Sequence, residues 1–237
     1  MPGNMWDEPE PSVAAGERPS ELDLRILRVA AEPAGPAFRL LIGTNRGDIQ
    51  ALLHPVEGGT AAVVCAGGAM GGMDGPADNL YARLPALLAA DAITVLRIDY
   101  RQPNDFEECV LDVLAGCSFL KGIGAADVAL VGHSFGGAVV IKAGEIAPIV
   151  RGVAALSPQL YGTREVEMLG KPLLLVHGMA DTILSHEASE DIYRRAEEPK
   201  RIVLYANAGH SLVQAKDQLD ALMTEWLPAL FAANGPP

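Results

Sequence analysis

The sequence predicts an α/β fold, a doubly wound and mostly parallel sheet flanked by helices on both faces. Short, wholly apolar runs recur along the chain, as expected of parallel strands that are buried on both faces. Segments with helical periodicity separate these runs, and no internal repeat or interdomain linker interrupts the alternation. The runs that we expect to form the parallel strands are 61–66, 93–98, 128–131, 153–156, 173–176 and 202–205.

The chain before residue 61 has a different pattern. Residues 22–30 alternate between apolar and polar side chains, and the runs 38–42 and 49–53 flank the turn-like sequence Thr-Asn-Arg-Gly at 44–47. This pattern predicts antiparallel strands at the start of the fold. Residues 1–20 are rich in Pro, Gly and Glu without apolar periodicity, which is typical of a disordered leader. We therefore expect one domain over 21–237.

Two helices are predicted most clearly. Asn104, with Glu107 three residues later, is placed to cap a helix. Its core-facing stripe would be Phe106, Val110, Val113, Cys117 and Leu120. A last helix would present the stripe Leu212, Ala215, Leu219, Leu222, Trp226 and Leu230, with Pro228 expected to kink it or end it early.

Composition excludes several classes of function. The chain has 237 residues, of which 49% are hydrophobic and 20% charged, enough to fill a sizeable core. The formal net charge of −12 argues against nucleic acid or an anionic membrane as partner. The N-terminus is acidic where a signal peptide would be basic and apolar, and no stretch is apolar enough to span a bilayer. We expect a soluble, cytoplasmic protein, with a homodimer left open.

The three cysteines, Cys65, Cys109 and Cys117, lie in apolar or amphipathic segments and lack the spacing of metal ligands. This placement predicts buried free thiols rather than a disulfide framework. The histidines and carboxylates match no metal-binding spacing such as HExxH, so no metal site is predicted. The glycine-rich stretch 67–72 lacks both the Lys-Ser/Thr ending of a P-loop and the GxGxxG pattern of a dinucleotide site, so no cofactor is expected.

The strongest motif follows the run 128–131, where Gly132-His133-Ser134-Phe135-Gly136 leads from a predicted strand into a predicted helix. A serine on so sharp a turn has strained backbone geometry, which requires small residues two positions before and after it. The helix directs free N–H groups and its positive end towards the same place. This pattern predicts a nucleophile elbow with Ser134 as the nucleophile.

Two further loops carry the residues that a serine nucleophile needs. Asp181 follows the run 173–176, and His210 follows the run 202–205. A serine hydroxyl needs a base to take its proton, and the base needs a carboxylate to fix its tautomer and stabilise its cation. In parallel sheets, loops after the strands gather at one edge. Ser134, Asp181 and His210 are therefore predicted to form a catalytic triad.

These motifs resemble those of the α/β-hydrolase superfamily, and in particular minimal, lidless serine hydrolases similar to dienelactone hydrolases. The resemblance spans about 38–231 and is carried by Gly132–Gly136, His177–Asp181, Gly209-His210 and Asp99-Tyr100-Arg101. It implies that Ser134 is the nucleophile, His210 the general base and later acid, and Asp181 the orienting carboxylate. Since dienelactone hydrolases proper use a cysteine nucleophile, Ser134 argues against dienelactone as the substrate.

The resemblance also implies an oxyanion hole built from two backbone amides. One belongs to Phe135, and the other lies in the loop 67–72, where Ala69 is favoured and Met70 is the alternative. Many relatives begin this loop with His-Gly, whereas Gly67-Gly68 stands here.

The other polar residues near these motifs are expected to have structural roles. We expect His133 to pack rather than react, because its side chain should leave the strand opposite Ser134. His177 should hydrogen-bond within its loop, and His54 and His186 should lie at the surface or at strand ends. Arg101 is compatible with a structural salt bridge or with binding a carboxylate.

The expected function is a cofactor-independent serine hydrolase that cleaves small carboxylic esters through an acyl-enzyme. A thioesterase, small-peptide hydrolase or transacylase shares the first half-reaction, and a non-catalytic binding protein could keep the fold. The connection 157–170 is too short to build a lid, which predicts an open, shallow cleft. Its expected borders are Met70, Phe135, Tyr161 and Ile183, and it should favour short acyl groups.

Overall fold

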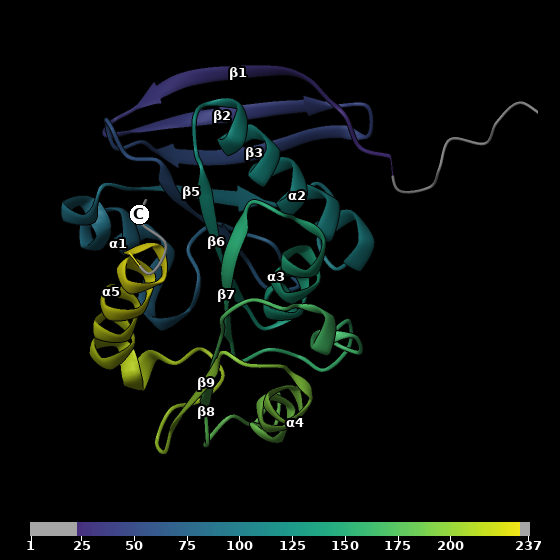
Figure 1. Ribbon diagram of the computed structural model, residues 1–237, viewed down its shortest axis with the longest axis vertical. Coiled ribbons are helices and arrows are strands. Elements are labelled where there is room, and N and C mark those ends of the chain that lie inside the picture. Colours follow the sequence, from purple (N-terminus) through teal and green to yellow (C-terminus); the bar gives the residue numbers. More distant parts are fainter. Residues whose placement is uncertain (1–22, 233–237) are drawn as a thin grey trace, which may run out of the picture.

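Nine strands form one mixed sheet in the computed structural model, which describes residues 23–232 (Figure 1). Their order across the sheet is β1-β2-β3-β5-β4-β6-β7-β8-β9. The strands are β1 (Ile26–Ala34), β2 (Ala37–Thr44), β3 (Gly47–His54), β4 (Ala61–Ala66), β5 (Ile93–Asp99), β6 (Asp127–His133), β7 (Val150–Leu156), β8 (Leu173–Gly178) and β9 (Lys200–Tyr205). Every predicted strand is present, and the predicted leader 1–20 lies outside the described residues.

The sheet divides into an antiparallel and a parallel part, as predicted. β1, β2 and β3 pair antiparallel, and β3 pairs antiparallel with β5. β4 to β9 run parallel. The first strand was predicted at 22–30 but extends to Ala34, because Gly35, at φ 64°, turns the chain tightly into β2.

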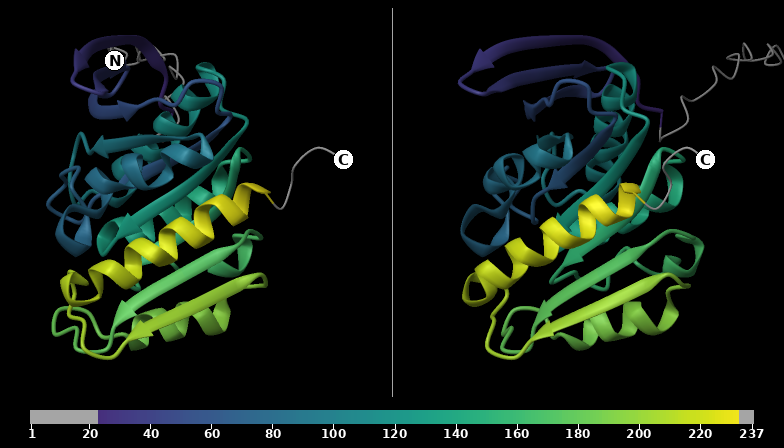
Figure 2. Two further views of the ribbon diagram at one scale, coloured as in Figure 1. Left: turned by 90° about the vertical axis from the view of Figure 1, so that its left-hand side faces the viewer. Right: turned by 60° about the vertical axis from the view of Figure 1, so that its left-hand side comes forward.

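Helices cover both faces of the sheet (Figures 1 and 2). α1 (Pro76–Leu88) and α5 (Lys216–Ala232) pack on one face, with the core cluster that includes Val63 and Cys65. α2 (Phe106–Gly122), α3 (Phe135–Ile146) and α4 (Glu187–Arg195) pack on the other, with Ala62 and Val64. Because successive residues of β4 point into opposite clusters, the strand is buried on both faces, which explains its continuous apolar sequence.

Two details of the predicted helices are wrong. Asp105, not Asn104, caps α2, because the Asp105 carboxylate accepts a hydrogen bond from the Glu108 amide at 3.2 Å. The backbone of Asn104 is in the left-handed region, at φ 69°. The last helix begins at Lys216 after a 3₁₀ turn, Val213–Ala215, and continues past Pro228 to Ala232. Proline removes one backbone hydrogen bond, but the burial of Leu230 in the following turn offsets that loss.

All three cysteines are buried and free, as predicted. Burial raises the pKa of Cys109 and of Cys117 to about 12, and that of Cys65 still further. The thiols are therefore protonated near neutral pH, which leaves them as small apolar core residues. Within residues 23–232, no helix has the length and apolar character needed to cross a membrane.

Candidate active site

Ser134 lies on the turn between β6 and α3, in the geometry that its flanking glycines predict. Its backbone angles are φ 59° and ψ −119°, a conformation rare for a residue with a side chain. A Cβ on Gly132 would collide with the Gly136 carbonyl, and one on Gly136 would collide with the Gly67 carbonyl. The Ser134 amide donates to the Leu156 carbonyl at 2.8 Å, which ties the turn to the end of β7.

The fold brings the predicted acid and base to this serine. His210 Nε2 lies 2.9 Å from Ser134 Oγ, and His210 Nδ1 lies 2.7 Å from Asp181 Oδ2. Because a carboxylate only accepts, Nδ1 carries the proton and Nε2 is left to accept from the serine hydroxyl. The three side chains thus form one hydrogen-bonded chain with the polarity that proton removal from Ser134 requires.

The carboxylate of Asp181 is fixed on both of its oxygens. Oδ1 accepts from the amides of Ile183 at 2.8 Å and Leu184 at 2.9 Å, and Oδ2 accepts from His210. Burial alone would raise the pKa of Asp181, but hydrogen bonds from Leu184, His210 and Ile183 outweigh it and hold the pKa below its usual value. Asp181 therefore stays ionised at neutral pH.

His133 packs against the candidate base, in agreement with the expected packing role. Its Nε2 lies 3.0 Å from the carbonyl oxygen of His210, and the two rings are 4.9 Å apart at 48°. Since that carbonyl only accepts, Nε2 of His133 is the donor. Burial lowers the pKa of His133 to about 4, so the ring is neutral at physiological pH.

This shift predicts a loss of stability in mild acid. The pKa of His133 falls from an ordinary 6.5 to about 4 on folding, so the unfolded chain takes up the proton first. The stability that neutral His133 provides is complete above pH 6.5 and is lost as the pH falls towards 4. The melting temperature should decline over this window, and less steeply in His133→Gln, whose amide can still donate to the His210 carbonyl. Parallel curves for the two proteins would contradict this assignment.

The loop 67–72 and the end of β4 that leads into it are held beside Ser134 by the side chains of Tyr81, Asp99 and Tyr100. Tyr81 Oη donates to the Ala66 carbonyl at 2.9 Å, Tyr100 Oη donates to the Gly67 carbonyl at 3.1 Å, and Asp99 accepts from the Gly72 amide at 2.8 Å. A Cβ on Gly68 would lie 3.9 Å from that of Ser134, so the loop adjoins the serine.

The amides near this serine are available to a ligand. Among the described residues, neither the Ala69 amide nor the Met70 amide meets an acceptor within hydrogen-bond distance. The Phe135 amide begins α3 and so lacks a partner within the helix. All three amides therefore lack a backbone acceptor among the described residues, and both predicted candidates for the second donor remain.

One of the four residues predicted to border the cleft, Phe135, has a buried side chain, so that prediction is wrong. Met70, Tyr161 and Ile183 are exposed, as a rim requires, but the side chain of Phe135 is buried. Its ring contacts Tyr100 and Phe106 edge to face, at centroid distances of 6.2 and 6.1 Å. The first turn of α3 directs this ring inwards, so only its backbone amide is available.

Phe106 also lies beside this region, a position that the sequence does not reveal. It lies between Phe135 and Tyr161, whose ring is 5.6 Å away. A Cβ on Gly162 would collide with the Phe106 ring. Only the packing of α2 against the 157–170 connection brings these rings together.

The remaining expectations about polar side chains can now be compared with the structure. The side chain of Arg101 is buried and forms salt bridges with Asp112 and Glu108, which confirms the first of its two expected roles. His177 hydrogen-bonds within its loop, as predicted, but it also contacts Asp181 and Ser189, which the sequence did not indicate. Across residues 23–232, no group of three or more His, Cys, Asp or Glu side chains could hold a metal ion.

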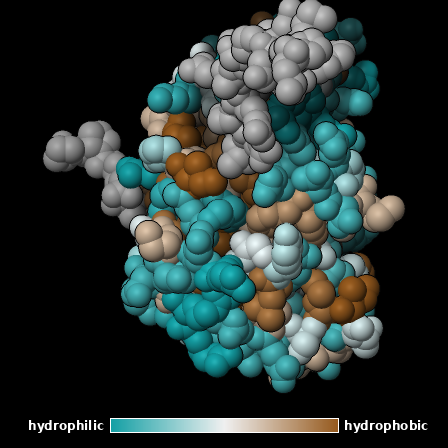
Figure 3. All heavy atoms as spheres, turned by 90° about the vertical axis from the view of Figure 1, so that its right-hand side faces the viewer, coloured by the Kyte–Doolittle hydropathy of each residue, from teal (hydrophilic) through white to brown (hydrophobic). Residues whose placement is uncertain are grey.

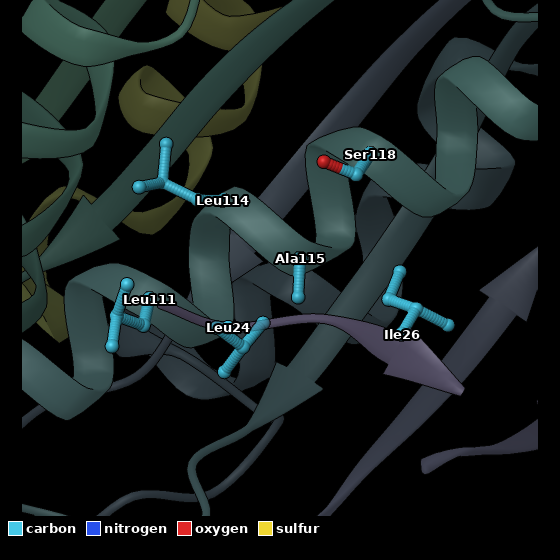
Figure 4. A pocket seen from close by; sticks show the side chains of 6 residues that line it. All are labelled: Leu24, Ile26, Leu111, Leu114, Ala115 and Ser118. Atoms are coloured by element: carbon cyan, nitrogen blue, oxygen red, sulfur yellow. The ribbon is translucent and has the colours of Figure 1, made fainter. Parts of the chain in front are cut away.

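Two apolar hollows lie along α2. One, of about 310 Å³, separates α2 from the start of β1 (Figure 4), and its lining includes Leu24, Ile26 and Leu114. The other, of about 340 Å³, lies between α2 and α3, and its lining includes Phe106 and Ile146. Apolar patches alternate with polar surface on the side of the molecule shown in Figure 3.

Comparison with known proteins defines the class of protein to which this chain belongs. The model of the alpha/beta hydrolase family matches residues 52–189. This match spans more than half of the chain, so the chain belongs to the α/β-hydrolase family, a family of hydrolases. The resemblance and the fold class predicted from the sequence are confirmed, while no curated protein matches.

Solved structures support the fold. Est1E from Butyrivibrio proteoclasticus has a TM-score of 0.72 and 16% identity, covering 82% of this chain and 99% of its own. A dienelactone hydrolase from Anabaena variabilis has a TM-score of 0.69 and 18% identity, covering 80% of this chain and 95% of its own. A putative α/β hydrolase from Agrobacterium tumefaciens has a TM-score of 0.70 and 15% identity, covering 84% and 100%. At these identities the likeness concerns the fold.

Proposed function

We propose that the protein is a serine hydrolase that cleaves small carboxylic esters through an acyl-enzyme. The observation that carries this proposal is the hydrogen-bonded chain from Ser134 through His210 to Asp181. His210 takes the proton of Ser134 as the hydroxyl oxygen attacks the ester carbonyl. It then gives that proton to the departing alkoxide, which leaves Ser134 acylated.

The second half of the reaction uses the same groups. His210 takes a proton from water, the resulting hydroxide attacks the acyl carbon, and the proton returns to Ser134 as the acid leaves. Amides of Phe135 and Ala69, with Met70 as the alternative to Ala69, donate to the oxyanion in both tetrahedral intermediates. Neither step needs a metal or a cofactor.

The size of the acyl group that the enzyme should prefer follows from the segment between β7 and β8. That connection contains only one short 3₁₀ turn, Val166–Met168, and the rim residues Met70, Tyr161 and Ile183 are exposed. An open cleft buries few methylenes, each of which contributes about 0.8 kcal/mol. We expect kcat/KM to peak at acetyl to butyryl esters, with no activation at an oil–water interface.

A panel of purified esters tests this expectation. It should vary acyl length, include the matching thioesters and amides, and include a feruloyl ester, because Est1E has been solved with ferulic acid bound. Thioesters or amides outperforming esters would change the leaving group assigned here. A preference for long or aromatic acyl groups, or interfacial activation, would contradict the open cleft. No turnover of any substrate, without labelling of Ser134, would favour a binding protein.

A further inference from the structure

We propose that His177 is a positioning residue of the triad, which holds the Asp181 carboxylate so that Oδ2 faces His210. This inference rests on the proposed function. His177 lies near the end of β8, four residues before Asp181, and its side chain is fully buried. Its Nε2 lies 3.1 Å from Asp181 Oδ2 and 3.1 Å from the Leu184 carbonyl oxygen.

The neighbours of His177 fix its tautomer. Both partners of Nε2 only accept, so Nε2 carries the proton and donates to them. Nδ1 lies 2.7 Å from the hydroxyl of Ser189, a buried residue of α4, which can donate to it. Burial lowers the pKa of His177, against the opposing effects of Leu184 and Asp181, so the ring is neutral. A neutral donor orients the carboxylate without cancelling the negative charge that His210 requires.

His177 completes the set of donors around the carboxylate. The amides of Ile183 and Leu184 occupy Oδ1, while His210 and His177 share Oδ2. His177 also binds the carbonyl of Leu184, so it holds both the carboxylate and the loop that supplies the Oδ1 donors. Without His177, only the catalytic histidine would fix Oδ2, and the carboxylate could rotate away from the line between His210 and Ser134. A displacement of about 1 Å can cost about 10²-fold in rate.

Two amide substitutions separate positioning from packing. In His177→Gln the side-chain nitrogen can take the place of Nε2 and donate to Asp181, whereas the shorter side chain of His177→Asn reaches only the place of Nδ1. The Asn variant should lose about 10²-fold in kcat with KM nearly unchanged. The Gln variant should restore most of that loss. His186→Gln, at the start of α4 and outside this network, controls for replacing a histidine in the same region.

Active-site titration by a fluorophosphonate corrects each kcat for the folded fraction, so that a change in stability alone does not alter the result. Equal kcat values for the Gln and Asn variants, or a wild-type kcat in the Asn variant, would overturn the role of His177. If the Asn variant does not fold, Ser189→Ala, which removes the hydrogen bond that anchors the His177 ring at Nδ1, should still lower kcat at constant KM, and an unchanged kcat would overturn the proposal. Failure of the proposed function gives a different result, because the wild-type protein itself would then neither turn over nor label at Ser134.

Discussion

Ser134→Ala should abolish ester turnover and fluorophosphonate labelling while leaving the protein folded. Removing the nucleophile of a serine triad lowers kcat by about 10⁶-fold, and the residual rate comes from the oxyanion hole and substrate binding. The fold should persist because the lost hydroxyl forms a hydrogen bond only with His210 among the described side chains, and alanine retains the Cβ that this strained position already accommodates. Kinetics, labelling and a melting curve on one preparation measure all three effects.

The other serines near this edge of the sheet provide the internal control. Ser157 follows β7 with its side chain fully buried, and Ser211 follows His210 directly. The burial of Ser157 should prevent its reaction with a probe. Labelling that persists at either residue in Ser134→Ala would show that the nucleophile has been assigned to the wrong serine.

Asp181→Asn should leave substrate binding nearly unchanged and lower kcat by about 10⁴-fold. The carboxylate accepts from His210 on one oxygen and from two backbone amides on the other. An asparagine has only one oxygen, so its NH₂ group must face either His210 or the two amides. In the first arrangement His210 adopts the wrong tautomer, and in the second the loop is disrupted. Steady-state kinetics that separate kcat from KM measure the effect.

Asp191→Asn is the matched control for this substitution. Asp191 lies on α4 and pairs with Arg194 and Arg195, away from His210, so its loss should leave kcat at the wild-type value. Near-normal activity in Asp181→Asn would mean that another carboxylate orients His210.

The sequence predicted those parts of the molecule that depend on local pattern and chain order. The buried strands are continuous apolar runs, and Ser134, Asp181 and His210 each follow a strand, so their approach to one another follows from the parallel topology. The helices α1 and α4 were less evident, because α1 contains Pro85 and α4 is strongly polar, with only Ala188, Ser189 and Ile192 buried.

The remaining features depend on contacts between distant segments. The buried Phe135 ring packs against Tyr100 and Phe106, and Ser189, the partner of His177 at Nδ1, comes from α4. No spacing in the sequence encodes these contacts. Asp105 caps α2 because the backbone of Asn104 is left-handed. Asn and Asp are about equally good caps, so the sequence alone does not decide between these two neighbours.

The most direct test of the central claim is to trap the acyl-enzyme and locate the acyl group. The protein would be mixed with an activated acetyl ester, quenched in acid during the initial burst, and analysed by intact mass and peptide mapping. The proposed mechanism predicts one acetyl group per molecule, on Ser134, which disappears as turnover proceeds. Steady turnover without an adduct, or an adduct on any other residue, would contradict covalent catalysis by Ser134.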